Sequence, residues 1–565
     1  MNDEGVKRKQ NITYELFYQY VKKNKSITFQ YFIFILLTYI LESIVLPRYS
    51  AQLFEIFQDK KHFQKVIKVF IYITIIWVII QGCMAYTGHI EAKLYPDIWI
   101  YLRNHIMKNL YYRYETDYQE LELGKINNQL SIIPGNFTEF VSVVFEYILP
   151  RIIIIICIII YFFFIHIKIG FVSLLLFGGL VLFYQMKMRT CVDLSHQRHK
   201  MFQDISEDVQ DKLSNLATIY TSGQVDNEIE WNKKSHHKFG EVYYQQNVCT
   251  NTIKTYAYVF NTVYFIVLIS LTLYLYKKGE ITSTSFIALF MTTLYLFTYL
   301  VRLTTNFPSL VLKMGIIEKT DDFLKDIHKE NKNHQLQKLH IKNGMIVYSH
   351  IDFGYDKENK ILNDVTLHIY PNTKTCILGS SGSGKSTLCK LLCKFYVPNK
   401  GIIYIDNQDI QHVDTNHLRK QISYVNQNTR LFNKTIYENI QYGNPNLTLS
   451  EIDHKIDELG IKDIFRNIHY NYHTNVGVNG SKLSGGQRQM VCILRELLNP
   501  SKILILDEPT ASIDEKNKRY IYKLIQNIGN EKTIIVITHD MNHLEIYDNI
   551  YLLKNGKIQN YNGKL

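Results

Sequence analysis

The chain has 565 residues, of which 47% are hydrophobic and 20% are charged, and its net charge is +12. The length alone predicts roughly three or four domains of ordinary size, unless part of the chain lies in a membrane. The composition is too apolar for an ordinary soluble enzyme. A basic balance is compatible with nucleic acid, anionic lipid or positive cytoplasmic loops, and we favour the last two.

The N-terminal tail, residues 1–27, is expected to be cytoplasmic. Basic residues precede the first long apolar run, namely Lys7, Arg8, Lys9, Lys22, Lys23 and Lys25. Basic residues also follow that run, which weakens the charge bias. The run begins near Thr28 and is too long for the apolar core of a cleavable signal peptide, so it should stay in the membrane.

Six stretches are long and apolar enough to cross a membrane as helices, which needs about 20 residues each. Their approximate cores are Phe29–Leu46, Val69–Tyr86, Val141–Ile165, Ile169–Tyr184, Tyr256–Tyr276 and Phe286–Val301. Buried helices of a soluble protein are the alternative, but six such runs argue against it. We therefore predict a transmembrane domain over residues 28–305.

The connections between these runs differ in length. The first, third and fifth are short, whereas the second (about Thr87–Phe140) and fourth (about Gln185–Thr255) are long, polar and compatible with helix. If the N-terminal tail is inside, both long connections face the cytoplasm. The helices are then expected to extend well beyond the bilayer on that side.

Charged residues inside the spans are functional candidates, because a charge in hydrocarbon is costly. They are Glu42, Glu146, Arg151 and Arg302, with Pro150 as an expected kink beside Arg151. The structural alternative is that Glu146 and Arg151 pair with each other or with neighbouring helices, and that Glu42 and Arg302 reach toward the membrane surface near the span ends. The residues alone do not decide between these alternatives.

A charged segment, residues 306–342, is predicted to link the membrane region to a soluble domain over residues 343–565. Short β-rich runs in that domain alternate with helical patterns, as in Ile402–Ile405, Ile503–Leu506 and Thr533–Ile537. This alternation predicts an α/β nucleotide-binding domain.

The eight cysteines show no C-x-x-C motif and no spacing typical of a disulfide framework, so no disulfide is expected. Cys389 and Cys393 lie four residues apart on a predicted helix. They could hold a metal, but no further ligand lies nearby in the sequence, and small buried thiols are the favoured interpretation.

A glycine-rich loop in the soluble domain fits the pattern G-x-x-x-x-G-K-[ST] between a β-like run, Thr375–Leu378, and an amphipathic helical stripe that ends at Val397–Asn399. Backbone N–H groups and the helix N-terminus are expected to converge there on a phosphate. Lys385 adds a charge for the outer phosphates, and Ser386 offers a hydroxyl to Mg²⁺. The predicted loop comprises Gly379, Ser380, Ser381, Gly382, Ser383, Gly384, Lys385, Ser386 and Thr387.

Two further motifs are expected near this loop. Asp507 and Glu508 follow a buried strand, and we assign Asp507 to the metal and Glu508 to the attacking water as general base. A second anion-binding helix N-terminus is predicted at Ser484, Gly485, Gly486 and Gln487. Two phosphate-binding loops on one chain suggest that each meets its ligand in a different subunit.

With these motifs in order, the sequence resembles a half-size ATP-binding cassette (ABC) exporter of the B-type, multidrug-like architecture over nearly its whole length. The resemblance implies six transmembrane helices with long cytoplasmic extensions, fused to an α/β P-loop ATPase domain of ABC type. It identifies 379–387 as the Walker A loop, 503–508 as the Walker B strand and 483–487 as the signature.

The resemblance also implies roles for single residues. Tyr355 matches the aromatic residue that stacks on adenine, and Gln427 matches the glutamine that touches Mg²⁺ and relays to the membrane domain. Asp514 lies in the matching D-loop, and His539 matches the histidine that contacts the γ-phosphate. The catalytic set is then Lys385, Gln427, Glu508 and His539, with Ser386, Gln427 and Asp507 toward the metal.

In this family two ATP molecules lie between two cassettes, so the resemblance implies a dimer with a second copy or with a paralogous half-transporter. One segment departs from the family pattern: Asn475 and Val478 stand where many exporters have acidic residues. That segment, Thr474–Gly480, is expected to contact the long membrane-domain loops near Tyr114–Gly124 and Leu216–Gly223. The departure puts charge-based coupling in doubt but leaves the ATPase chemistry intact.

The sequence therefore predicts an ATP- and Mg²⁺-dependent exporter in a lipid bilayer, with its nucleotide-binding domain in the cytoplasm and an unidentified substrate. An ATP-gated channel or regulatory receptor on the same scaffold is the alternative, although the intact hydrolytic residues argue against it. A soluble ATPase of DNA repair or translation is excluded by the six spans, and we expect no nucleic-acid partner.

Overall fold

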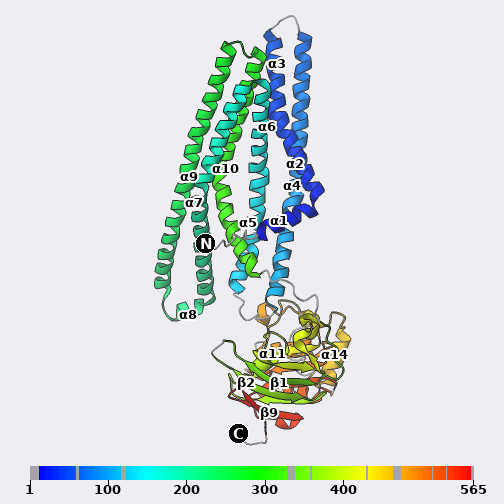
Figure 1. Cartoon of the computed structure of the whole chain (residues 1–565). Coiled ribbons are helices and arrows are strands. Elements are labelled where there is room, and N and C mark those ends of the chain that lie inside the picture. The colour runs from blue at the N-terminus through cyan, green and yellow to red at the C-terminus, as the bar shows by residue number, and fades with distance from the viewer. Residues whose placement is uncertain are drawn as a thin grey trace, which may run out of the picture. The chain divides into compact units, whose positions relative to one another are not determined.

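The structure is a computed structural model that describes residues 12–58, 63–115, 123–327, 337–356, 359–427, 430–461, 472–511, 513, 515–529 and 531–561. It divides into two compact units (Figure 1). The first comprises residues 1–113 and 121–329, and the second comprises 114–120 and 330–565. Each unit is described by itself.

The first unit is helical. Its helices are α1 (Ile12–Lys23), α2 (Lys25–Ile40), α3 (Leu46–Gln58), α4 (Phe63–Arg113), α5 (Leu123–Ser142), α6 (Leu149–Ile165), α7 (Ile167–Ser214), α8 (Leu216–Thr221), α9 (Val225–Lys277) and α10 (Ser283–Ile327), with π-helical segments at Leu41–Val45 and Val143–Ile148. Within the described ranges, six helical stretches are able by length and composition to cross a membrane: Lys25–Ile56, Gln64–Arg113, Gln129–Ile165, Ile167–Ser214, Val225–Lys277 and Ser283–Ile317. All six predicted spans lie within them.

The long fourth connection is an extension of two helices. α7 and α9 lie side by side, and the short helix α8 joins their far ends (Figure 1). Gly223 closes the turn after α8 with a φ of +64°, a conformation that glycine adopts without steric cost. The predicted polar segment therefore forms a helical hairpin continuous with the fourth and fifth spans.

Pro150 stands in the first turn of α6, directly after the π-helical segment Val143–Ile148. Proline has no N–H, so the carbonyl of Glu146 loses its usual helical partner four residues on. The Arg151 guanidinium donates to the carbonyl oxygens of Glu146 (3.2 Å) and Tyr147 (2.5 Å). A π-helical segment thus precedes Pro150, and the Arg151 side chain binds the carbonyls of Glu146 and Tyr147.

The second unit contains two sheets. A four-stranded antiparallel sheet has the order β2 (Leu362–Ile369), β1 (Ile346–Phe353), β4 (Lys400–Ile405), β5 (Gln408–Asp409). A six-stranded sheet has the order β10 (Lys557–Asn560), β9 (Asn549–Lys554), β3 (Lys374–Leu378), β8 (Thr533–Thr538), β7 (Ile503–Asp507), β6 (Ile422–Val425). All its pairings are parallel except that of β10 with β9.

The helices of this unit are α11 (Lys385–Leu392), α12 (Thr415–Lys420), α13 (Ile436–Ile440), α14 (Leu449–Glu458), α16 (Gly485–Leu497) and α17 (Glu515–Asn527). Short 3₁₀ turns lie at Ile410–His412, Gln441–Gly443, Val478–Gly480 and Leu544–Ile546. The α/β prediction is confirmed, and Ile503–Leu506 and Thr533–Ile537 form central parallel strands. Ile402–Ile405 is also a strand, but it pairs in the antiparallel sheet.

The helix after the glycine loop is shorter than predicted. It ends at Leu392, because Cys393 caps it and Lys394 has a φ of +55°. Phe395, the last residue of the predicted stripe, therefore lies beyond the helix and packs at the edge of the core. An apolar residue after a helix end can continue the helical spacing without belonging to the helix.

Asp406 fixes the point where the chain enters the second unit. Its carboxylate accepts hydrogen bonds from four consecutive backbone N–H groups, those of residues 342–345, at 2.7–3.1 Å. Burial alone would raise the pKa of Asp406, but these N–H groups stabilise the charged form, and the net effect is a lowered pKa. The ionised carboxylate therefore anchors the residues that precede β1 to the turn between β4 and β5.

Candidate functional site

The glycine-rich loop connects β3 to α11 at the carboxyl edge of the six-stranded sheet. Gly382 and Gly384 have φ values of +78° and +103°, which a residue with a side chain rarely adopts. The loop bends around Lys385, whose ammonium donates to the carbonyl oxygens of Gly379 (2.8 Å) and Ser380 (2.9 Å). The buried Ser383 hydroxyl has no hydrogen-bond partner among the residues that the structure describes. This donor fits an anion bound in the loop.

Asp507 ends β7 and lies beside the start of α11. Its two carboxylate oxygens accept hydrogen bonds from the Ser386 hydroxyl (3.0 Å) and the Tyr424 hydroxyl (2.9 Å). Burial raises the pKa of Asp507, although both hydroxyl groups act in the opposite direction. No sequence motif assigns a role to Tyr424, and only its contact with Asp507 reveals one.

Glu508 is the point where the predicted catalytic residues meet. One carboxylate oxygen accepts a hydrogen bond from the Gln427 amide (2.8 Å). The other lies 3.8 Å from Lys385 Nζ and 3.6 Å from His539 Nδ1. These residues come from four separate segments of the chain, so their proximity is a property of the fold. Lys385 is buried, which lowers its pKa, while the carboxylates of Glu508 and Asp507 counteract that effect.

Tyr355 lies at the rim of this cluster with 45% of its surface exposed. Its hydroxyl is 3.2 Å from the Thr387 hydroxyl in the glycine-loop helix. The ring makes edge contacts with Phe353 and Tyr396, at centroid distances of 5.2 and 5.1 Å. An exposed ring held at this place can stack on a flat base. Tyr396 supports the ring and has no motif that would have identified it.

The second predicted anion-binding loop forms a well-capped helix start. The Ser484 side chain accepts a hydrogen bond from the Gln487 backbone, and the Gln487 side chain accepts one from the Ser484 backbone. Gly485 and Gly486 open α16. Leu483 and this helix pack in a different hydrophobic cluster from α11. Within the described ranges, no hydrogen bond or ion pair joins residues 484–487 to the glycine loop. Asp514 lies outside the described residues.

The segment with the unusual neutral residues has a local structure of its own. The Asn475 side chain accepts a hydrogen bond from the Gly477 N–H (2.8 Å), and Gly477 has a φ of +77°. Val478 is 65% exposed. Asn475 thus closes a turn, while Val478 presents an apolar surface. Residues 116–122, part of the expected contact with this segment, lie outside the described ranges.

The charged residues of the helical unit find separate partners. Glu42, in the π-helical segment Leu41–Val45, accepts a hydrogen bond from the Tyr299 hydroxyl (3.3 Å), and Glu146 accepts one from the Ser142 hydroxyl (3.1 Å). Among the residues that the structure describes, no ion pair within 4 Å joins Glu146 to Arg151, because Arg151 binds backbone carbonyls instead. Sequence reasoning missed Glu91, which accepts a hydrogen bond from Tyr31 (2.7 Å).

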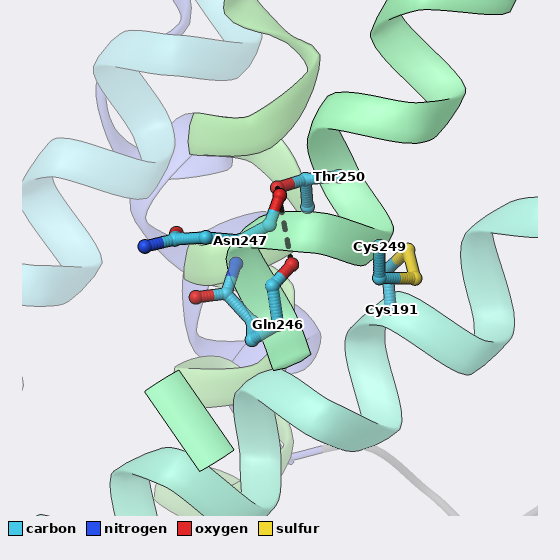
Figure 2. The surroundings of a disulfide bond; sticks show 5 residues. All are labelled: Cys191, Gln246, Asn247, Cys249 and Thr250. Carbon is cyan, nitrogen blue, oxygen red and sulfur yellow. Dashed lines mark hydrogen bonds between the residues drawn. A yellow bond between two sulfur atoms is a disulfide. The ribbon is translucent and has the colours of Figure 1, made fainter. Parts of the chain in front are cut away.

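The expectation that the chain has no disulfide is wrong. Cys191 on α7 and Cys249 on α9 are joined, with Cα atoms 5.7 Å apart (Figure 2). The two cysteines are 58 residues apart in the sequence, so only the packing of the helical hairpin brings them together. Cys389 and Cys393 are buried free thiols on and after α11, and burial raises the pKa of Cys393 to about 12.

In a comparison with known protein families, residues 362–511 match the family model for ABC transporters. The chain is 35% identical over 269 residues to the ATP-dependent lipid A-core flippase 1 of Colwellia psychrerythraea, which covers 46% of this chain and 44% of the relative. It is 37% identical over 217 residues to the alpha-hemolysin translocation ATP-binding protein HlyB of Escherichia coli, which covers 38% of this chain and 31% of the relative. These alignments span less than half of each relative.

The fold extends the likeness to nearly the whole chain. A solved structure of a bacterial Atm1-family ABC exporter with ATP bound superposes with a TM-score of 0.83 over 94% of both chains, at 21% identity. At 21% identity, this similarity shows that the two chains share a fold. The second unit of this chain is thus an ATP-binding domain of the ABC transporter family, and the chain as a whole has the fold of an ABC exporter.

Proposed function

We propose that this chain is an ATP-hydrolysing exporter that works as a dimer and moves a substrate across a membrane by alternating access. The observation that supports this most directly is the convergence of Lys385, Gln427 and His539 on Glu508. The same chain carries six helices long and apolar enough to span a membrane. A hydrolytic centre and a membrane-spanning bundle on one chain favour coupling between them.

In this proposal ATP binds with its base against the Tyr355 ring and its phosphates in the loop 379–387. Backbone N–H groups of the loop and the N-terminus of α11 hold the phosphates, and Lys385 supplies the positive charge. The residues present fit Mg²⁺, since Ser386, Asp507 and Gln427 offer the oxygen ligands that this hard cation prefers. When bound, the ion neutralises charge that develops on the phosphates.

Hydrolysis is assigned to Glu508. Its carboxylate orients the attacking water and accepts a proton from it as general base. Gln427 and His539 hold that carboxylate from two sides, at 2.8 and 3.6 Å. In the proposed reaction His539 also contacts the outermost phosphate, and its 61% exposed side chain leaves room for that contact.

The dimer follows from the separation of the two anion-binding loops. Among the residues that the structure describes, no hydrogen bond or ion pair joins residues 484–487 to the glycine loop, so we infer that they complete the ATP site of a second cassette. Asp514 is proposed to lie at the same interface. The partner is a second copy or a paralogous half-transporter, and the complete catalytic set in this chain is compatible with two working sites.

The arrangement in the membrane is also part of the proposal. We assign residues 1–27 to a cytoplasmic tail, 28–305 to the transmembrane domain, 306–342 to the linker and 343–565 to the cytoplasmic ATP-binding domain. An even number of spans places the tail and the ATP-binding domain on the same side of the bilayer.

The proposal is tested by reconstituting the full chain in liposomes and screening solutes of different classes for ATP-dependent uptake against a gradient. Glu508→Gln is the matched control. It should still bind ATP but lose hydrolysis by about 100-fold or more, because the general base is missing. Uphill movement that requires Glu508 supports an exporter. Passive conductance gated by ATP in both proteins would instead indicate a channel.

A further inference from the structure

The disulfide lies just beyond the membrane-spanning part of its two helices. Cys191 follows the fourth predicted span, which ends at Tyr184, and Cys249 precedes the fifth, which begins at Tyr256. Each cysteine is therefore seven residues from its span, or about 10 Å along a helix. The bond joins the two arms of the hairpin, α7 and α9 (Figure 2), and by its place in the sequence it lies at the base of their extension.

Topology determines the compartment that surrounds this bond. The ATP-binding domain follows the sixth span, and the hairpin lies between the fourth and fifth, so both are on the same side of the membrane. This step rests on the proposed function. A compartment that supplies ATP is normally kept reducing by glutathione and thioredoxin, and a disulfide there is typically redox-sensing or transient. The position of the bond is thus unusual for a purely structural disulfide.

The surroundings allow a stepwise exchange. Cys191 is fully buried in a cluster with Val192, Ile253, Phe307 and Val311. Cys249 lies at the margin of the same cluster and is partly exposed. The Cα–Cα distance of 5.7 Å lies within the range that a disulfide accepts without backbone movement. A small thiol reagent can therefore reach Cys249, while Cys191 stays in place as the resolving cysteine.

Between the bond and the tip, non-covalent contacts join the two arms: the Phe202 and Phe239 rings have centroids 6.1 Å apart, and the Lys212 ammonium of α7 donates to the Asn232 side chain of α9 (2.9 Å). One turn or two toward the tip, Arg198 donates to the Gln246 amide oxygen (2.8 Å) and its guanidinium lies over the Tyr243 ring at 4.2 Å. Beyond that level a cavity of about 390 Å³ opens, lined by side chains of α7 and α9, including Met201, Ile205 and Trp231. Within the described residues, Cys191–Cys249 is the one covalent tie between the arms.

We propose that Cys191 and Cys249 form a redox-responsive cross-link that sets how far the α7–α9 hairpin can open. In the oxidising direction, the Cys249 thiolate attacks a low-molecular-weight disulfide and releases one thiolate. The Cys191 thiolate then attacks the mixed disulfide at Cys249 and releases the second. One small disulfide is reduced to two thiols, and the two cysteines lose two protons and two electrons. A small thiol pool reverses both steps.

The test uses the full chain in nanodiscs, equilibrated with mixtures of reduced and oxidised glutathione. Free thiols are alkylated, and the linked and unlinked peptides around Cys191 and Cys249 are quantified by mass spectrometry. Within the range of glutathione ratios found in cells, we expect Cys191 and Cys249 to be mostly disulfide-bonded at the oxidising end and mostly reduced at the reducing end. A bond that stays closed throughout, or that never forms, overturns the proposal.

The hairpin is followed by hydrogen exchange in the same samples. Reduction should speed exchange in residues 198–243 by about fivefold, because the arms separate more often, and the change should be smaller in α10. Cys191→Ser and Cys249→Ser should show the faster exchange at every ratio, whereas Cys83→Ser should behave as wild type. Equal exchange in linked and unlinked protein would contradict the proposal. Neither readout depends on ATP turnover, so failure of the exporter assignment remains distinguishable.

Discussion

The two units of this chain distribute polar groups in opposite ways. In the ATP-binding unit every residue of β7 and β8 is buried, and the polar side chains gather at one edge of the sheet around Asp507 and Glu508. In the helical unit large apolar side chains face outward, as Phe164 does with 85% exposure, while Glu42 and Arg151, which lie within the predicted spans, have separate partners. Lipid is as apolar as the helix surfaces, so burial does not separate core from surface there.

This difference shows where a single residue is informative. In the ATP-binding unit, the role of a polar group is inferred from the groups around it, and the cluster as a whole specifies the chemistry. In the helical unit, each charge first requires a structural explanation, and Arg151 has one in the carbonyls beside Pro150. Substitutions at Lys385, Arg151, Asp406 and Tyr424 separate these two situations.

Lys385→Met should weaken ATP binding by about 100-fold, because it removes the charge that faces the phosphates. Binding is measured with a fluorescent ATP analogue on purified protein. Lys390→Met, further along α11, is the matched control and should bind within about twofold of wild type. Equal losses in both variants would mean that Lys385 contributes only to the overall positive charge near the site and makes no specific contact with the phosphates.

Arg151→Met should destabilise the helical unit by about 1–3 kcal/mol, since the carbonyls of Glu146 and Tyr147 lose their donor. Thermal unfolding in detergent measures this loss. Arg302→Met, at an exposed position, should change the midpoint little. If Arg151→Met is as stable as wild type but loses transport, Arg151 binds substrate and our structural explanation is wrong.

Asp406→Asn should lower the stability of the ATP-binding unit by about 1–3 kcal/mol at pH 7, where the carboxylate is charged and bound by four N–H groups. The folded pKa of Asp406 is lowered, so its contribution is fully present above the pKa of the unfolded chain and is lost as pH falls through the folded value. The difference from wild type should therefore shrink in acid. Asp364→Asn, on an exposed carboxylate, should lower the stability at pH 7 by less than Asp406→Asn does.

Tyr424→Phe tests the smallest effect. Removing the hydroxyl should raise the pKa of Asp507 further, because one hydrogen bond to its charged form is lost. The acid limb of the ATPase profile should then move to higher pH, with activity at pH 6 lower by about twofold to threefold. Tyr442→Phe, at an exposed ring, should leave the profile unchanged. An unshifted acid limb in Tyr424→Phe would show that protonation of Asp507 does not determine the acid limb of the ATPase profile.

Much of this architecture follows from the sequence, for identifiable reasons. Hydrophobic length is sufficient to predict the six spans, and the glycine loop needs Gly382 and Gly384 for its positive φ values. The end of α11 could not be predicted, since Phe395 keeps the helical spacing after the helix has stopped. Tyr396, Tyr424 and the Cys191–Cys249 bond depend on contacts between distant segments, which no local pattern contains.

The carboxylate of Asp406 also has a mechanical consequence. Four successive N–H groups converge on this side chain just before β1, and Gln337 and His340 upstream are also bonded to the domain, so these contacts together bear tension on the preceding chain before it reaches β1. The load then enters the turn between β4 and β5 and is carried sideways into the antiparallel sheet. A pull on this chain from its N-terminal side should leave the nucleotide loop, on the other sheet, undisturbed until that anchor breaks.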